Sequence, residues 1–260
     1  MKEKKSERSH WDDFWRRDRD LDEIYDNDGR IPQELGRRLE VSGRKVMEVG
    51  AATARDSVVL AREGAVVIAL DYSHEALRLA RKAADRAGAE LLLVCGDALS
   101  LPFREESMDI VFHQGVLEHF RDPLPLLGEN ARVLKPGGTL LVDVPQTFHV
   151  YTLMKKSLIA FNAWFAGWET QFTVKSLSSL LRRAGLEPSG AYGRFFSPSL
   201  AYRVLREALM KLRITLPLRP VLVPPVHRLR RLIRRKAESS PLGTGLGCVI
   251  GVFARKPDRS

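Results

Sequence analysis

The junction between residues 45 and 61 constrains the fold of this chain more than any other stretch. Lys45–Val49 is a short apolar run that ends at Gly50, and a helical pattern resumes with the apolar residues 58–61. Small residues between the two let backbone N–H groups and the start of the helix approach a polar ligand, as at the carboxyl ends of parallel strands. The pattern therefore predicts a first strand, a tight loop and a first helix around a nucleotide-like ligand.

A second apolar run, Val66–Leu70, ends at Asp71. Its distance from Gly50, about 20 residues, suits a carboxylate that receives ribose hydroxyls. A nicotinamide cofactor would need the pattern Gly-x-Gly-x-x-Gly to admit its pyrophosphate, whereas this loop continues with alanines at 51, 52 and 54. The two runs favour an adenosine-bearing ligand other than a dinucleotide.

The residues Glu48-Val49-Gly50-Ala51-Ala52-Thr53-Ala54 resemble the first motif of the class I S-adenosylmethionine-dependent methyltransferases, acid-x-Gly-x-Gly-x-Gly. Two of the three glycines are alanines here, and alanine costs about 1 kcal/mol or more wherever the loop requires a positive φ. We therefore expect a slightly displaced cofactor loop. The same departure motivates two alternatives, a turn that serves only close strand–helix packing and a non-catalytic protein that binds S-adenosylmethionine.

Later motifs extend the resemblance from Lys45 to Val144. A third strand over 90–95 is followed by Asp97-Ala98, and a fourth over 108–113 by Val116-Leu117-Glu118-His119, a signature of the small-molecule, quinone-biosynthesis-like subgroup. The resemblance implies an α/β fold, a doubly wound, seven-stranded, mostly parallel Rossmann-like sheet with inserted helical and basic segments, whose last strand, 247–254, lies antiparallel between strands five and six. It also implies the cofactor residues Glu48, Gly50, Ala52, Asp71, Tyr72, Asp97, Ala98, His113 and Gln114.

Methyl transfer from a sulfonium is an in-line displacement, so the protein must hold the nucleophile in line and exclude water, with base catalysis where the nucleophile carries a proton. We expect His119 to be the base, since a histidine can take a phenol or enol proton at neutral pH. Glu118 is the second catalytic candidate. The alternative is a histidine that only packs against the loop or positions the cofactor.

The length of 260 residues suits one core with insertions. The segment 1–44 is expected to form a helical lid over the cleft, with an aromatic staple on the surface as the alternative. The segment 146–172 is expected to form a substrate cap lined by Tyr151, Phe161, Trp164, Phe165 and Trp168, or else a helix that packs its apolar side on the core. The expected ranges are 1–44 for the lid, 45–145 for the core, 146–172 for the cap, 173–194 for the continued core, 195–245 for a basic insertion and 246–260 for the last strand and tail.

The net charge of +10 favours an anionic partner. Most of the excess lies in 203–236, where basic and aliphatic residues alternate as in an amphipathic segment on an anionic membrane; nucleic acid and a plain solvated helix are the alternatives. Charged residues after Met1 and the lack of a run of about 20 apolar residues predict a cytoplasmic protein, peripheral at the inner face of the membrane. Cys95 and Cys248 have no partner at metal-ligand spacing, so we expect buried free thiols and no metal.

These features favour a methyltransferase that acts on a small, lipophilic or aromatic acceptor. An RNA methyltransferase that grips its substrate with the basic insertion is the alternative. Against it, the fourth strand is followed by Gln114-Gly115-Val116 and not by the Asn/Asp-Pro-Pro-aromatic pattern of the amino-methylating families.

Overall fold

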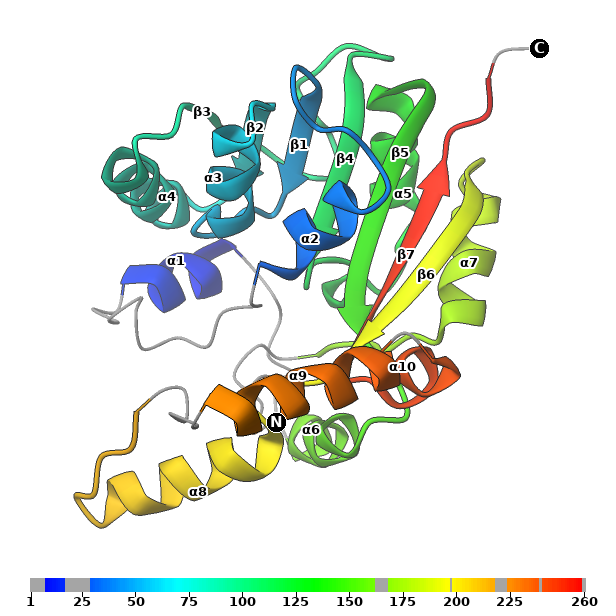
Figure 1. Ribbon diagram of the computed structural model, residues 1–260. Coiled ribbons are helices and arrows are strands. Elements are labelled where there is room, and N and C mark those ends of the chain that lie inside the picture. The colour runs from blue at the N-terminus through cyan, green and yellow to red at the C-terminus, as the bar shows by residue number, and fades with distance from the viewer. Residues whose placement is uncertain are drawn as a thin grey trace.

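The structure is a computed structural model that describes residues 8–16, 29–161, 168–196, 198–217, 224–238 and 240–258. Its centre is a seven-stranded sheet with the order β3-β2-β1-β4-β5-β7-β6 (Figure 1). Strand β7 pairs antiparallel with both β5 and β6, and all other pairs are parallel. The strands are β1 (Lys45–Val49), β2 (Val66–Asp71), β3 (Leu91–Cys95), β4 (Met108–Gln114), β5 (Leu134–Pro145), β6 (Glu187–Arg194) and β7 (Val249–Arg255). The doubly wound, mostly parallel sheet predicted from the sequence is confirmed.

Helices cover both faces of the sheet. Apolar side chains of α2, α3 and α4 pack in one buried cluster on one face, and those of α5 and α7 pack in a second cluster on the other. The order of the sheet reverses between β1 and β4, which puts the carboxyl ends of β1, β2 and β4 around a switch point, the usual ligand position in such sheets. The helices are α1 (Arg8–Arg16), α2 (Arg30–Gly36), α3 (Arg55–Arg62), α4 (His74–Ala87), η2 (Leu117–His119), α5 (Leu124–Val133), α6 (Val150–Ala160), α7 (Val174–Arg183), α8 (Leu200–Lys211), α9 (Pro224–Glu238) and α10 (Pro241–Leu246).

Local signals in the sequence place several of these ends correctly. Ser73 caps α4 by accepting a hydrogen bond from the backbone N–H of Ala76. Helix α7 begins with a capping box formed by Thr173 and Ser176. The last strand, expected from residue 247, starts two residues later, because its ends follow the antiparallel pairing of β7 with β6.

The two expected insertions are both helical. Residues 195–245 contain α8, α9 and α10, and α6 lies after β5 within the expected cap. The interpretation of α6 as a helix that packs its apolar side on the core is wrong, since its apolar side chains face outward and Phe161, proposed to line a substrate cap, is 79% exposed. Trp164 and Phe165, proposed for the same lining, lie outside the described residues.

Candidate functional site

A cavity of about 660 Å³ lies at the carboxyl ends of β1 to β4, a volume within the usual range for sites that bind small molecules. Eight of the eleven residues predicted to bind cofactor or to act in catalysis come together on its wall: Gly50, Ala52, Asp71, Tyr72, Asp97, Ala98, Gln114 and His119. The other described residues on the wall are Trp11, Trp15, Leu70, Cys95, Gly96, Gly115, Val116 and Phe120. The prediction of a buried thiol is wrong for Cys95, which is exposed, and Cys248 is buried. The wall is polar beside β2 and β3 and aromatic beside α1 and η2.

The loop after β1 keeps a left-handed backbone despite its alanines. Gly50, Ala52 and Ala54 have φ values of 67°, 49° and 52°. The two alanines are therefore strained, because each adopts a conformation that costs about 1 kcal/mol relative to glycine. At Gly50 the close approach is also steric, since a Cβ there would lie 2.5 Å from Cγ2 of Val116.

Asp71 connects this loop to the start of α4. Its Oδ2 accepts a hydrogen bond from the backbone N–H of Ala52 at 2.8 Å, and its Oδ1 accepts one from that of Ser73 at 2.9 Å. Burial raises the pKa of Asp71, and the bonds from the two N–H groups oppose that rise. The carboxylate keeps lone pairs for further donors, since each of its oxygens can accept two hydrogen bonds.

Asp97 stands at the next strand end, where its Oδ1 accepts a hydrogen bond from the backbone N–H of Leu99 at 2.9 Å. This bond closes the turn after β3 and keeps Gly96, Asp97 and Ala98 on the cavity wall. The side chain of Asp97 is exposed, whereas that of Asp71 is buried.

Glu48 lies behind the cavity and is not among the described residues that line it. The hydroxyl of Ser57 on α3 donates to Oε2 of Glu48 at 2.5 Å, and both side chains are buried. Burial, together with the nearby Asp56, raises the pKa of Glu48 well above its usual value. In this position Glu48 ties β1 to α3, so it can shape the cofactor loop from behind.

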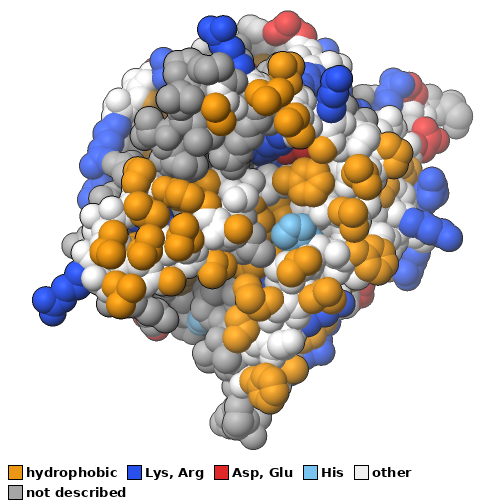
Figure 2. Space-filling model, turned by 60° about the horizontal axis from the view of Figure 1, so that its bottom comes forward, with side chains coloured by type: hydrophobic (Ala, Val, Ile, Leu, Met, Phe, Trp, Pro, Cys, Tyr) orange, Lys and Arg blue, Asp and Glu red, His pale blue; other side chains and the backbone are white. Residues whose placement is uncertain are grey.

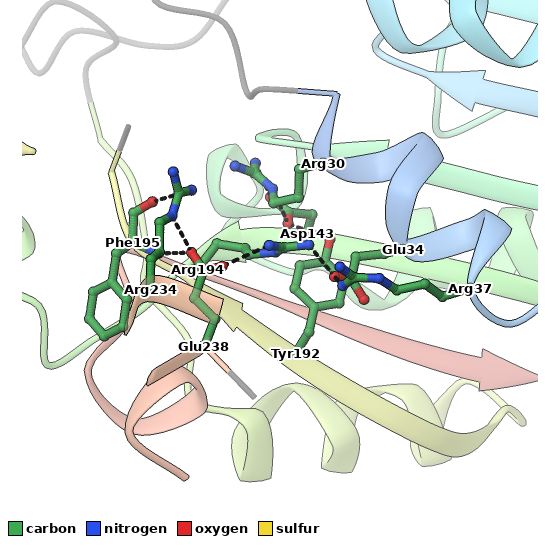
Figure 3. Close-up of polar contacts among 9 residues, drawn as sticks. All are labelled: Arg30, Glu34, Arg37, Asp143, Tyr192, Arg194, Phe195, Arg234 and Glu238. Atoms are coloured by element: carbon green, nitrogen blue, oxygen red, sulfur yellow. Dashed lines mark hydrogen bonds and ion pairs between the residues drawn. The ribbon is translucent and has the colours of Figure 1, made fainter. Parts of the chain in front are cut away.

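Arg30 holds Gln114 at the end of β4 (Figure 3 shows Arg30, Asp143 and Tyr192). Its Nη2 donates to Oε1 of Gln114 at 3.0 Å, and its guanidinium donates to both oxygens of Asp143 at 2.8 and 3.0 Å. Tyr192 donates its hydroxyl to Asp143 at 2.7 Å. The guanidinium of Arg30 is thus largely buried, and its side chain is only 13% exposed.

Sequence reasoning missed this cluster, although one signal was present. Asp143 interrupts the apolar run of β5, and a buried carboxylate needs a cationic or hydrogen-bonding partner. The sequence does not show that the partner comes from residue 30, which is 113 positions away.

His113 is buried in the sheet and does not belong to the described lining of the cavity. Neither ring nitrogen has a hydrogen-bond partner in the described part of the chain. Burial lowers the pKa of His113 to about 3, so the ring is neutral at physiological pH. The side chain has the environment of a core residue and touches the site only through its neighbour Gln114.

His119 reaches the cavity from η2. Its Nδ1 is buried and has no partner among the residues described, and its ring contacts that of Trp11 edge-on at 5.3 Å between centroids. Burial lowers the pKa of His119, which keeps the imidazole neutral and able to accept a proton at pH 7.

Glu118 lies next to His119 but outside the described cavity wall, with no partner for its Oε2 in the part of the chain that the structure covers. Burial and the nearby Glu169 raise the pKa of Glu118 to about 8. Glu169 itself forms a buried ion pair with Lys155 of α6, and Thr170 donates its N–H to the backbone oxygen of Glu118 at 2.9 Å. Glu118 is therefore a neutral carboxyl group behind the wall at pH 7.

Helix α1 covers one side of the cavity with Trp11 and Trp15. It is held to α4 by Asp12, which accepts a hydrogen bond from the hydroxyl of Ser73 at 2.5 Å, and by Arg16, which pairs with Glu75 at 3.8 Å. Ser73 is the residue that also donates its N–H to Asp71. The aromatic helix is thus attached to the same residues that shape the polar end of the cavity.

Comparisons with known proteins agree with this geometry. The model of a family described as "Methyltransferase domain" matches residues 47–142. A ubiquinone biosynthesis O-methyltransferase of Ruegeria pomeroyi is 29% identical over 201 residues, which cover 74% of this chain and 80% of the relative. The methyltransferase GfsG of Streptomyces halstedii is 32% identical over 133 residues, 50% of this chain and 48% of that protein.

Two solved structures share the fold. An S-adenosylmethionine-dependent methyltransferase from Mesorhizobium loti is 17% identical, with a TM-score of 0.56, and the match covers 87% of this chain and 97% of that one. Magnesium protoporphyrin IX methyltransferase from Synechocystis, solved with bound SAH, is 14% identical with a TM-score of 0.56, over 88% of this chain and 80% of that one.

Proposed function

The chain belongs to the class I S-adenosylmethionine-dependent methyltransferases, and on this premise we propose that it methylates a small, lipophilic or aromatic acceptor. One observation carries the proposal: a single cavity joins a polar end, with Asp71 and Asp97, to an aromatic end, with Trp11, Trp15 and Phe120. Relatives named as ubiquinone biosynthesis O-methyltransferases support an acceptor of this chemistry and a hydroxyl oxygen as the methylated atom.

The polar end fits S-adenosylmethionine. Asp71 would accept the ribose hydroxyls and Asp97 the adenine amine, while the Gly50–Ala52 loop would face the amino-acid part of the cofactor. The missing Cβ at Gly50 leaves the space that such a close approach requires. When bound, the cofactor supplies an electrophilic methyl group on a sulfonium.

The aromatic end would bind the acceptor and would contain the residue that takes the proton from it. Trp11 and Trp15 on α1 line the cavity and would exclude water from it, in the lid role expected of the N-terminal segment. His119, whose ring lines the cavity and whose pKa is lowered by burial, would take the proton from the acceptor hydroxyl. Glu118, as a neutral group behind His119, would hold η2 in place and not act as the base.

We further propose that the basic segment 203–236 brings the enzyme to an anionic membrane surface, where a lipophilic acceptor is concentrated. Net charge supports this, because residues 195–245 contain eleven Lys and Arg against two acidic residues, a net +9 within the chain's total of +10. Leucine-rich spacing and the scarcity of aromatic side chains in 203–236 favour a membrane over single-stranded nucleic acid.

The experiment has two stages. Calorimetric titration with S-adenosylmethionine and S-adenosylhomocysteine tests the cofactor assignment, and binding of neither would refute it. Incubation with methyl-labelled cofactor and separate lipid and RNA fractions then tests the acceptor. A methylated lipid-soluble product found by mass spectrometry is the expected result, and label in RNA alone would establish the alternative.

A further inference from the structure

Helix α6 turns its polar side toward the protein and its apolar side toward the surroundings. Its inward side is polar: Thr152 donates its hydroxyl to the backbone oxygen of Gln146 at 2.7 Å, and Lys155 forms a buried ion pair with Glu169. Its outward side is apolar, at the spacing i, i+3, i+4, i+8 and i+11. The outward residues are Val150, Leu153, Met154, Leu158 and Phe161, which are 36 to 79% exposed. A helix in water has the opposite arrangement.

Helices α8 and α9 lie beside α6 at the same end of the molecule (Figure 1) and also expose apolar side chains. Turned toward the viewer in Figure 2, this end carries apolar side chains across its surface, with Lys and Arg mostly around its edge. The exposed apolar residues of these two helices and the chain after α8 are Val204, Leu205, Met210, Leu212, Ile214, Val226, Leu229, Leu232 and Ile233. Together with the outward residues of α6 they form a surface that we call the apolar face.

The apolar face gathers exposed apolar side chains from three helices, so it differs from isolated exposed leucines on a surface. Patches on a monomer that stays in water rarely exceed a few hundred Å², and larger ones with a polar rim mark a protein or membrane contact. Among the described helices none is long and apolar enough to span a bilayer, so a membrane would be met along the surface. The basic residues of α9, including the exposed Arg228 and Lys236, match an anionic surface.

We propose that the apolar face docks on an anionic phospholipid bilayer, with α6 as the element that inserts its outward side chains among the lipids. This rests on the proposed membrane contact of residues 203–236 and adds an apolar anchor from a separate part of the sequence. The basic residues draw the protein to the surface, and α6 adds apolar burial that salt does not screen.

The inward side of α6 connects the proposed membrane contact to the segment behind His119. Lys155 pairs with Glu169, and the next residue, Thr170, donates its N–H to the backbone oxygen of Glu118. One side of α6 would therefore lie in lipid while the other supports the segment behind His119.

Vesicle co-sedimentation of the full-length chain tests the apolar anchor. Leu153→Ser and Phe161→Ser should each reduce partitioning onto vesicles of phosphatidylcholine and phosphatidylglycerol by about fivefold, because each removes a side chain that would otherwise leave water. Leu92→Ser on β3 is the matched control: Leu92 is 57% exposed against 56% for Leu153, and it lies at the edge of the sheet away from α6. This control should not change partitioning.

The charge contribution is tested separately. Arg228→Gln with Lys236→Gln should weaken binding to anionic vesicles by about fivefold per charge and make it less sensitive to salt. Arg62→Gln with Lys82→Gln removes two exposed charges from α3 and α4 and should have little effect. The effect of Leu153→Ser should persist at high salt, which separates the apolar anchor from electrostatic attraction.

Two results would overturn the docking proposal: equal pelleting of wild type, Leu153→Ser and Phe161→Ser, or self-association in sedimentation velocity that these two substitutions abolish, which would assign the face to a second copy of the chain. Calorimetric titration of the same variants with S-adenosylhomocysteine distinguishes the two proposals. Retained binding shows that a lost vesicle contact concerns the apolar face and not the cofactor site.

Discussion

Two regions at the carboxyl ends of the strands satisfy their polar groups differently. The first region is at the ends of β1 to β3, and the second is at the end of β4 with η2. Asp71 and Asp97 accept hydrogen bonds from loop N–H groups, and Glu48 accepts one from Ser57. Beyond β4, by contrast, Glu118 and His119 each keep a buried polar atom without a partner among the described residues.

This difference indicates that the two regions have different roles. Loops whose hydrogen bonds are already made are preorganised, so the cofactor meets a wall that needs little rearrangement. Buried groups without partners cost stability, and they are typically retained where a ligand or a reacting group completes them. The first region is therefore expected to control cofactor affinity, and the second to control turnover and its dependence on pH.

The largest expected effect tests the second region. His119→Asn should lower turnover by about 10²-fold or more, the usual contribution of a general base, and change cofactor affinity little. Burial lowers the pKa of His119, so the wild-type acid limb should lie below 6.5, with activity falling as the pH drops through it. The substitution should remove that limb from the pH profile of kcat/KM.

His149→Asn is the matched control for this measurement. Burial also lowers the pKa of His149, but the ring packs against Phe196 and is not on the described cavity wall. Its Nδ1 accepts the N–H of Tyr151, a bond that asparagine can replace. Unchanged turnover in His119→Asn would refute the proposal that the second region controls turnover.

The next effect tests the first region. Asp71→Asn should raise the Kd for S-adenosylhomocysteine by about 10- to 100-fold in calorimetry, because hydrogen bonds from ribose hydroxyls to a charged acceptor are lost. Asp109→Asn is the control, since Asp109 lies at the opposite end of the sheet, where it accepts from Lys45 and Lys135. If cofactor affinity stays the same in Asp71→Asn, the ribose assignment is incorrect.

A smaller effect concerns the stability cost of the second region. The pKa of Glu118 rises from 4.5 to about 8 on folding, so the folded state prefers the protonated form and stability falls as the pH rises from 4.5 to 8. Glu118→Gln cannot ionise, so it should gain about 1 to 3 kcal/mol relative to wild type between pH 5 and pH 8 in chemical denaturation.

Glu129→Gln should give the opposite sign. The hydrogen bond from Arg132 lowers the pKa of Glu129, so its ionised form stabilises the fold at pH values above its ordinary pKa, and that contribution is lost as the pH falls. Parallel pH dependence in the two variants would show that burial of Glu118 is not the cause.

The smallest effect concerns the cofactor loop. Gly50→Ala should lower the free energy of unfolding by about 1 to 2 kcal/mol for its positive φ, and it should also weaken cofactor binding because the new Cβ displaces Val116 from the cavity wall. Gly43→Ala shares the positive φ, at 71°, but meets no atom within 4 Å. It should show the loss of stability in thermal unfolding without the loss of affinity.

Local signals in the sequence predict much of the first region and little of the second. Asp71 follows an apolar strand, Ser73 has the spacing of a cap, and their roles depend on neighbours within a few residues, so periodicity and spacing suffice. Glu48 and His113 also lie at strand ends, yet the structure places both behind the cavity. Side chains alternate between the two faces of a strand, and only packing decides which position opens toward the ligand.

Local sequence patterns also fail to predict the contacts of Arg30 and the orientation of α6, because both depend on residues far apart in the sequence. Arg30 pairs with Asp143, 113 positions away, and no local pattern distinguishes it from the solvated arginines around it. The apolar side of α6 has the spacing expected of a buried face. Lys155 turns the opposite side inward, because its partner Glu169 lies there.

The sequence by itself determined the order of strands and helices, the doubly wound sheet and the strand-end residues of an adenosine-type site, since these follow from hydrophobic periodicity and from short-range turn and capping chemistry. The tertiary structure alone decided which of those residues face the cavity, which charges are buried in pairs and which side of α6 is left to its surroundings. Each of these outcomes depends on the burial of a group against a partner distant in sequence, and burial changes the free energy of a charge or an apolar side chain more than any local preference does.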